Sequence, residues 1–270
     1  MKIEAACCCH TGRIRIRNED NFVFDGMYLP ADNKGSNGVI SMPAQELSKP
    51  VCFGVFDGMG GEQYGEYAAF IAAGTFSNVS NSRLPLFGKK QRKKQEKEHD
   101  RNPRELLREA CLTANDSICR MASEHNGTRS GTTVAALYFH KTNVWVCNVG
   151  DSKVYLLNAD EFKQISVDHT NQDSLLRQGI TGRRPALTQH LGIHPDEMLI
   201  EPSISNAELK AGDLYLICSD GLTDMLSDKE ITTVAANGKS VKERVLQLTE
   251  DALNRGGRDN VTVILCDISG

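Results

Sequence analysis

Short apolar, β-branched runs separated by polar and glycine-containing segments dominate the chain. The runs at 51–56, 214–218 and 261–265 are apolar or β-branched, which is typical of buried strands, and the last of them is predicted to begin a strand over 261–268. We predict further strands at 2–10, 132–139, 143–149 and 153–157, with 21–29 as the hairpin partner of 2–10. Residues 30–50 contain many turn-forming residues and predict a loop.

Helical patterns occur in separate groups between these strands. Residues 62–78 follow a cluster of glycines and offer small side chains for packing. A second helix is predicted after Asn102, which can cap it, with Pro103 in its first position. Ser240 and Glu243 form a capping box for a third helix. Runs of strands and runs of helices favour a layered α+β fold, and no break in composition divides residues 1–270 into two domains.

Charge is distributed unevenly along the 270 residues, whose net charge is −4. Residues 83–104 are strongly basic, so we predict an exposed basic insertion at 80–102, and the remainder of the chain is acidic. An acidic body argues against nucleic acid as a partner. The apolar stretch 67–76 is too short to span a membrane, and the N-terminus lacks the apolar core of a signal peptide. We therefore expect a cytoplasmic protein with no membrane partner.

Nine cysteines, an odd number, indicate reduced thiols. Cys7, Cys8 and Cys9 precede His10, which suggests a metal site at first sight. Adjacent residues of a strand point to opposite faces, so three in a row do not converge on one ion. We interpret this run as strand packing.

Acidic residues recur where apolar runs end or begin. Asp57 and Asp220 follow two of the runs, Asp259 precedes a third, and Glu19 and Asp20 precede another. A carboxylate at the end of a buried strand is costly to desolvate unless a cation or donor compensates it. Convergence of these strand ends would create a site for hard cations, Mg²⁺ or Mn²⁺ in preference to Zn²⁺. Each Asp-Gly pair taken alone is equally compatible with an ordinary turn.

The same residues carry a resemblance to a known family. Seven short motifs occur in the order seen in metal-dependent protein phosphatases of the PPM family (type 2C), and they resemble its bacterial branch. They are the segment from Gly12 through Arg15 to Asn18-Glu19-Asp20, then Asp57-Gly58-Met59-Gly60-Gly61, Gly131-Thr132-Thr133, Gly150-Asp151-Ser152, Asp168-His169-Thr170, Ser219-Asp220-Gly221-Leu222 and Asp259-Asn260-Val261-Thr262. The resemblance implies a four-layer α-β-β-α sandwich of two antiparallel sheets flanked by helices, with a metal cleft at one edge.

The resemblance also implies roles for individual residues. Asp57 would bridge two Mn²⁺ or Mg²⁺ ions, Asp220 and Asp259 would complete one site, and Glu19 with the Gly58 carbonyl would complete the other. Asp20 is a further candidate ligand. A metal-bridging water would hydrolyse phosphoserine or phosphothreonine in proteins phosphorylated by a serine/threonine kinase, and the enzyme would be a monomer.

A phosphate-binding arginine is implied at Arg15. If residues 13–17 are extended, Arg13, Arg15 and Arg17 share one face, so the residues alone leave open which of them reaches the substrate. Residues 170–190 correspond to the family's flap, in which Arg177, Arg183 and Arg184 either contact substrate or are solvated.

Other motifs have structural interpretations or depart from the family. We interpret Gly150-Asp151-Ser152 as a hairpin turn, and Asp168-His169-Thr170 as an anchor for the flap. Met59 replaces a histidine found in animal members, so it supplies no proton to the leaving group. Thr128, Arg129 and Ser130 stand where relatives have an aspartate for a third metal, so that site should be weak. The alternative function is a pseudophosphatase, a regulatory module on the same fold.

Overall fold

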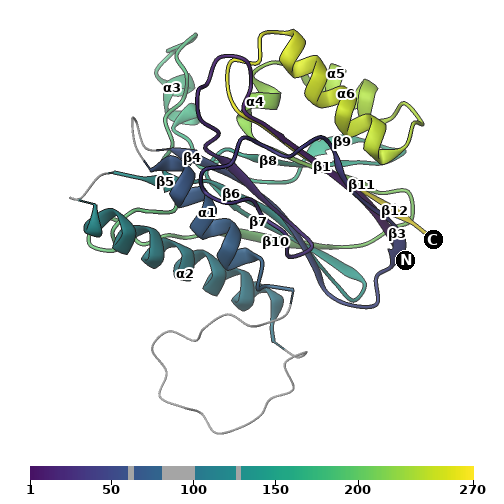
Figure 1. Cartoon of the computed structure of the whole chain (residues 1–270), viewed down its shortest axis with the longest axis horizontal. Coiled ribbons are helices and arrows are strands. Elements are labelled where there is room, and N and C mark those ends of the chain that lie inside the picture. Colours follow the sequence, from purple (N-terminus) through teal and green to yellow (C-terminus); the bar gives the residue numbers. More distant parts are fainter. Residues whose placement is uncertain (60–63, 81–100, 126–128) are drawn as a thin grey trace, which may run out of the picture.

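The computed structural model describes residues 1–59, 64–80, 101–125 and 129–270. Within these ranges the strands form two sheets, in which all neighbouring strands are antiparallel (Figure 1). The first sheet has the order β3-β1-β12-β11-β8-β9, with bounds Ile40–Glu46, Lys2–His10, Val261–Ser269, Leu214–Cys218, Lys153–Leu157 and Phe162–Gln164. The second has the order β10-β7-β6-β4-β2, with bounds Ser203–Glu208, Asn143–Val149, Val134–His140, Val51–Met59 and Asp20–Phe24, and the short β5 (Gly131–Thr132) pairs with β4.

Helices cover the outer faces of both sheets. The helices α1 (Gly65–Phe76) and α2 (Pro103–Glu124) pack on the second sheet. The first sheet is covered on the opposite side of the molecule by α4 (Asp220–Thr223), α5 (Asp228–Ala235) and α6 (Val241–Asn254) (Figure 1). The short helix α3 (Gln172–Arg177) lies in the segment predicted as a flap. This arrangement confirms the α-β-β-α sandwich.

The two sheets are held together by an apolar layer between them. Phe53 of β4 packs edge-on against Phe24 of β2, with ring centroids 5.1 Å apart, and lies 6.0 Å from Phe139 of β6. Tyr215 and Ile264 contribute from the other sheet. Since burial of one large apolar side chain contributes about 1.5–3 kcal/mol, this layer fixes how the two sheets face each other.

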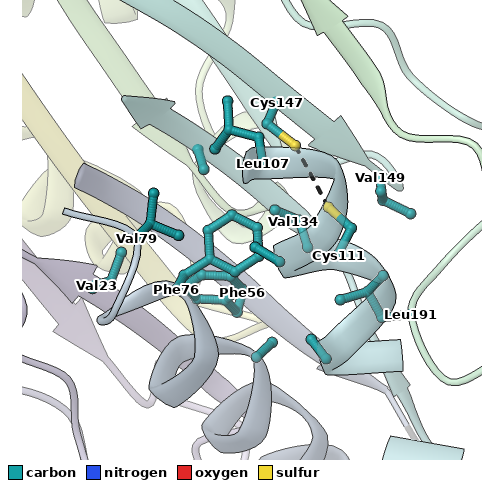
Figure 2. Close-up of a cluster of buried hydrophobic side chains, with 14 of the residues drawn as sticks. Val23, Phe56, Phe76, Val79, Leu107, Cys111, Val134, Cys147, Val149 and Leu191 are labelled. Carbon is teal, nitrogen blue, oxygen red and sulfur yellow. Dashed lines mark hydrogen bonds between the residues drawn. The ribbon is translucent and has the colours of Figure 1, made fainter. Parts of the chain in front are cut away.

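A second apolar cluster joins α1 and α2 to their sheet (Figure 2). Phe56 of β4 lies 5.3 Å from Phe76 of α1 between ring centroids. The Sγ atoms of Cys111 and Cys147 are 3.6 Å apart in the same cluster, and both residues are fully buried. Leu107 of α2 packs beside them. The cluster explains why α2 carries one apolar face.

Both predicted helix caps are formed. The Asn102 side chain accepts the backbone N–H of Arg104 at 3.0 Å. At the start of α6, the Ser240 hydroxyl accepts the Glu243 N–H at 3.3 Å, and the Glu243 carboxylate accepts the Ser240 N–H at 3.0 Å. The cysteine run is strand packing as predicted, because Cys7 and Cys9 point between the sheets while Cys8 points toward α6.

Three predictions about strand pairing and extent are wrong. The strand β2 pairs with β4 and not with β1, which lies between β12 and β3. Residues 40–46 form the edge strand β3, in which Pro43 is tolerated because a register shift against β1 leaves it outside the paired positions. The strands β7 and β8 belong to different sheets, so residues 150–152 form a crossover and no hairpin.

The basic insertion predicted at 80–102 lies largely outside the described residues. In the ranges that are described, no helix is both long enough and apolar enough to cross a membrane.

Candidate active site

Four strand ends meet at one edge of the sandwich and bring the predicted acids together. Asp20 of β2 stands opposite Asp57 of β4 in the second sheet. In the first sheet, β11 leads into α4, which begins at Asp220, and Asp259 precedes β12. Asp57 is affected electrostatically by Asp220, Asp20 and Asp259, which shows that carboxylates from both sheets share one site.

Desolvation and neighbouring acids together raise the pKa of Asp57. Burial is the largest cause of this rise, followed by the negative charges of Asp220, Asp20, Asp151 and Asp259. Burial also raises the pKa of Asp220 to about 6, with further contributions from Asp151 and Asp224. Like charges held at this proximity favour protonation or a bound cation.

Asp20 ties the two sheets together. Its Oδ2 accepts a hydrogen bond from the Ser219 hydroxyl at 2.8 Å and another from the Thr262 hydroxyl at 2.7 Å. Asp20 is 1% exposed, and burial raises its pKa to about 7 although both hydroxyls oppose that rise. The carboxylate therefore lies next to the site, but one of its oxygens is already used in joining β2 to β11 and β12.

Glu19 and Gly58 approach each other through the backbone. The Gly58 N–H donates to the Glu19 carbonyl at 3.1 Å. A Cβ at position 58 would lie 2.3 Å from the Gly65 carbonyl oxygen, and one at Gly65 would lie 2.9 Å from Glu19 Oε1. Only glycine fits at position 58, where the clash is with backbone atoms, whereas a side chain at position 65 would displace the Glu19 carboxylate. The Glu19 carboxylate is thereby held against the start of α1.

Asn260, to which the sequence motif assigned no role, positions the segment before Glu19. Its side-chain oxygen accepts the Glu19 N–H at 2.8 Å. Its Nδ2 donates to the carbonyls of Thr11 at 2.7 Å and Arg17 at 2.9 Å. One buried amide thus holds three points of the loop that carries Arg15.

The sequence left open which of three arginines, Arg13, Arg15 or Arg17, reaches the substrate. In the structure the three have different partners. Arg15 Nη2 lies 2.7 Å from Asp259 Oδ2 at the acidic cluster. Arg13 donates to the Leu253 carbonyl at the end of α6, and Arg17 lies 3.3 Å from Glu66. Residues 13–17 are not a strand, so the expectation of a shared face fails. Arg15 alone of the three contacts a predicted metal ligand.

The segment predicted as a flap reaches the site through one arginine. Arg184 contacts the carboxylate of Asp220 and lies 3.7 Å from that of Asp224. Arg177 is occupied within α3, where its Nε donates to the Asp173 carbonyl. Arg183 is exposed. Of the three arginines considered for substrate contact, only Arg184 faces the acidic cluster.

Asp168-His169-Thr170 anchors this segment, as predicted. Asp168 forms an ion pair with Lys153 and accepts from Gln164 Nε2 at 2.6 Å. His169 accepts the Gly150 N–H at 3.2 Å, and its backbone N–H donates to the Gly150 carbonyl at 2.9 Å. The anchor therefore holds the start of the segment against the crossover at 150–152.

Asp151 belongs to the acidic cluster, which sequence reasoning missed. The turn before it needs the positive φ of +99° at Gly150, and the Ser152 hydroxyl lies 2.6 Å from that of Thr133. Burial raises the pKa of Asp151, while Lys153 and Arg184 lower it. The clue in the sequence was its place two residues after Val149, the end of the apolar run that forms β7.

Two of the three residues that stand in place of the third-metal aspartate, Arg129 and Ser130, lie in the described ranges. Thr128 lies outside the described residues. Arg129 is exposed, and the Ser130 hydroxyl donates to the Tyr64 carbonyl at 2.8 Å. Neither described residue supplies a carboxylate in place of the aspartate found in relatives.

The donor set suits hard divalent cations. The partly buried Asp57, together with Asp220, Asp259, Glu19 and a backbone carbonyl, offers oxygen ligands only. In the described ranges, no three acidic, histidine or cysteine side chains are already grouped as a metal cage. Arg15 and Arg184 instead contact two of the carboxylates. These guanidinium groups neutralise charge that bound cations would otherwise neutralise.

Comparison with known sequences identifies the family to which the chain is similar. The family model described as Protein phosphatase 2C matches residues 12–177, more than half of the chain. A serine/threonine phosphatase, stp, from Listeria welshimeri is 29% identical over 265 residues, which cover 95% of this chain and 92% of the relative. The serine/threonine protein phosphatase PstP of Mycobacterium tuberculosis is 31% identical over 225 residues, 78% of this chain but only 39% of that longer protein.

Solved structures support the fold independently. The crystal structure of the Mycobacterium tuberculosis phosphatase PstP/Ppp superposes with a TM-score of 0.77 at 26% identity, with all of both chains covered. The catalytic domain of PstP in complex with two manganese ions gives a TM-score of 0.72 at 25% identity, again over all of both chains.

Proposed function

The chain belongs to the protein phosphatase 2C family of metal-dependent serine/threonine protein phosphatases, and we propose that its cluster of Asp57, Asp220, Asp259 and Glu19 holds two divalent cations that hydrolyse phosphoserine and phosphothreonine in proteins. The observation that carries the proposal is the gathering of carboxylates from both sheets around the partly buried Asp57, which stands opposite Asp20 and whose pKa is raised by desolvation and by the charges of Asp220, Asp20 and Asp259. Two cations in such a site would neutralise the phosphoryl oxygens and activate a water for in-line attack.

Each residue of the cluster has a proposed task. Asp57, at the junction of the two sheets, would be shared by both cations. Asp220 and Asp259 would hold one cation, and Glu19 with the Gly58 carbonyl would hold the other. Asp20 would orient the site through Ser219 and Thr262, because its Oδ2 accepts both hydroxyls.

Arg15 would bind the substrate phosphate. Its side chain is 49% exposed and lies at the edge of the cluster, so the guanidinium can leave Asp259 for a phosphate without being pulled from the core. A guanidinium can meet two phosphate oxygens at once, which a lysine cannot.

The cellular setting follows from the same family membership. We propose Mn²⁺ or Mg²⁺ as the cations, phosphoproteins made by a serine/threonine kinase as substrates, and a monomer in the cytoplasm as the working form. A regulatory module without catalysis is disfavoured, since a binding-only domain has no reason to keep mutually repelling carboxylates together.

Hydrolysis of a phosphothreonine peptide with Mn²⁺ and with a chelator tests the proposal. Asp57→Asn should lower kcat/KM by at least ~100-fold, because both cations lose a shared ligand. Asp160→Asn, the same change at an exposed turn, should retain full activity. Metal-independent turnover, or appreciable turnover by Asp57→Asn, would contradict the assignment.

A further inference from the structure

A cavity of about 460 Å³ opens beside Glu19, between the N-terminal loop and the start of α1. Its wall includes Arg17 and Asn18 from the loop, Asp32, and Tyr64, Glu66 and Tyr67 around the first turn of α1. None of these residues belongs to the proposed metal or phosphate ligands. The cavity therefore needs an explanation of its own.

The cavity shares a wall with the proposed active site. Arg17 and Asn18 directly precede Glu19 in the chain. Gly65, between two residues of the cavity wall, lies against the Glu19 carboxylate. A peptide whose phosphorylated residue lies at the acidic cluster would place a neighbouring side chain at this cavity, because successive residues of an extended peptide are only about 3.3 Å apart.

Two buried oxygens in the wall lack hydrogen-bond donors. Asn18 is 1% exposed; its Nδ2 donates to Asn33 Oδ1 at 2.6 Å, whereas its Oδ1 has no partner. The Glu66 side chain is 11% exposed; its Oε1 lies 3.3 Å from Arg17, whereas its Oε2 has no partner. A buried acceptor left unpaired costs about 1–3 kcal/mol. Both oxygens would be satisfied by a ligand rich in N–H donors.

An aromatic wall completes the cavity. The rings of Tyr64 and Tyr67 are 5.8 Å apart between centroids. Tyr64 has a φ of +74°, an unfavourable conformation for a residue with a side chain, and its carbonyl is held by the Ser130 hydroxyl. Strain of this kind costs about 1–3 kcal/mol and is concentrated at functional sites. Tyrosine rings also attract guanidinium groups.

We propose that this cavity is a specificity subsite that binds an arginine side chain of the substrate, close in sequence to the phosphorylated residue. The proposal rests on the proposed phosphatase function. The guanidinium would donate to Glu66 Oε2 and Asn18 Oδ1 and lie against Tyr67, while the phosphate is bound at the acidic cluster.

Matched phosphothreonine peptides test the subsite. One series places arginine at each flanking position in turn, and the second places citrulline, its neutral analogue, at the same positions. The ratio of kcat/KM for arginine over citrulline should be roughly tenfold at one position, as expected for hydrogen bonds to a charged group. The ratio should fall toward one in Glu66→Gln and in Tyr67→Ala. It should persist in Glu208→Gln, the same change on exposed β10 at the opposite edge of the sheet.

The possible outcomes are separable. A ratio near one at every position, or a ratio unaffected by both cavity variants, would overturn the subsite while leaving the phosphatase function intact. A third series places glutamate at the same positions, because the basic Arg17 and Lys34 also line the cavity. A preference for the glutamate peptides would mean that these two cations dominate the cavity, which also overturns the subsite. If no peptide is hydrolysed, the proposed function fails, and calorimetry with phosphonate analogues of the same peptides then decides the subsite by the same ratio.

Discussion

The side-chain amide of Asn260 holds the backbone of Glu19, with 2.8 Å between Asn260 Oδ1 and the Glu19 nitrogen. The same amide donates to Thr11 and Arg17, so residues 241 or more apart in the chain are joined at one buried point. This residue comes directly after Asp259. The loop bearing Arg15 and Glu19 is therefore positioned by the strand end that carries a proposed metal ligand.

Replacement of Asn260 should lower the stability of the protein, because its side chain holds the backbone of the loop that carries Arg15 and Glu19. Asn260→Ala removes three hydrogen bonds and should lower the free energy of unfolding by about 2–4 kcal/mol, measured by urea denaturation. Asn206→Ala, on exposed β10, is the control and should change stability little. An unchanged free energy of unfolding in Asn260→Ala would show that water replaces these bonds.

Arg15→Ala should act on substrate binding more than on the metals. We expect a rise of about tenfold or more in KM for a phosphothreonine peptide, because a bidentate charged contact is lost. The affinity for Mn²⁺ should not fall, since Arg15 competes for Asp259. Arg15→Lys keeps the positive charge but not the forked guanidinium, so its KM should lie between that of the unmodified protein and that of Arg15→Ala. An unchanged KM would move the phosphate-binding role to Arg13 or Arg17.

Arg184 should oppose metal binding at Asp220. The arginine contacts that carboxylate, so Arg184→Gln should tighten Mn²⁺ binding in calorimetric titration. Arg183→Gln, the exposed neighbour, removes the same charge without this contact and is the matched control. Equal changes in both variants would indicate a general charge effect and not a direct contact.

The metal-free protein should become more stable as pH falls through mildly acidic values. Burial raises the pKa of Asp20 to about 7 and that of Asp220 to about 6, so between the ordinary aspartate pKa and these values the folded state binds more protons than the unfolded state. Stability contributed by these groups must then decrease as pH rises through this window.

Urea unfolding in the presence of a chelator, from about pH 5 to about pH 8, measures this dependence. Asp220→Asn should flatten it, and saturating Mn²⁺ should reduce it, since bound cations favour the ionised carboxylates. If the stability of the metal-free protein instead increases as pH rises through this window, the negative charges of these acids are compensated in the folded protein.

Local sequence patterns determined the elements and the chemistry of the site. Apolar runs identified β4, β11 and β12, and side-chain caps located the starts of α2 and α6. The positions of Asp57, Asp220 and Asp259 at the ends of these runs indicated that acids would gather. Such signals are readable because strand burial and capping depend on residues close together in the chain.

The pairing of the strands and the partners of the side chains at the site were decided only by the tertiary structure. Residues adjacent in sequence do not reveal that β2 pairs with β4, or that β7 and β8 belong to different sheets. The crossover between those sheets places Asp151 at the acidic cluster, and packing against α6 and α1 gives Arg13 and Arg17 partners away from it. The cause is physical: a hydrogen bond or ion pair depends on distance in space, and the packing of the two sheets sets that distance for residues far apart in the chain.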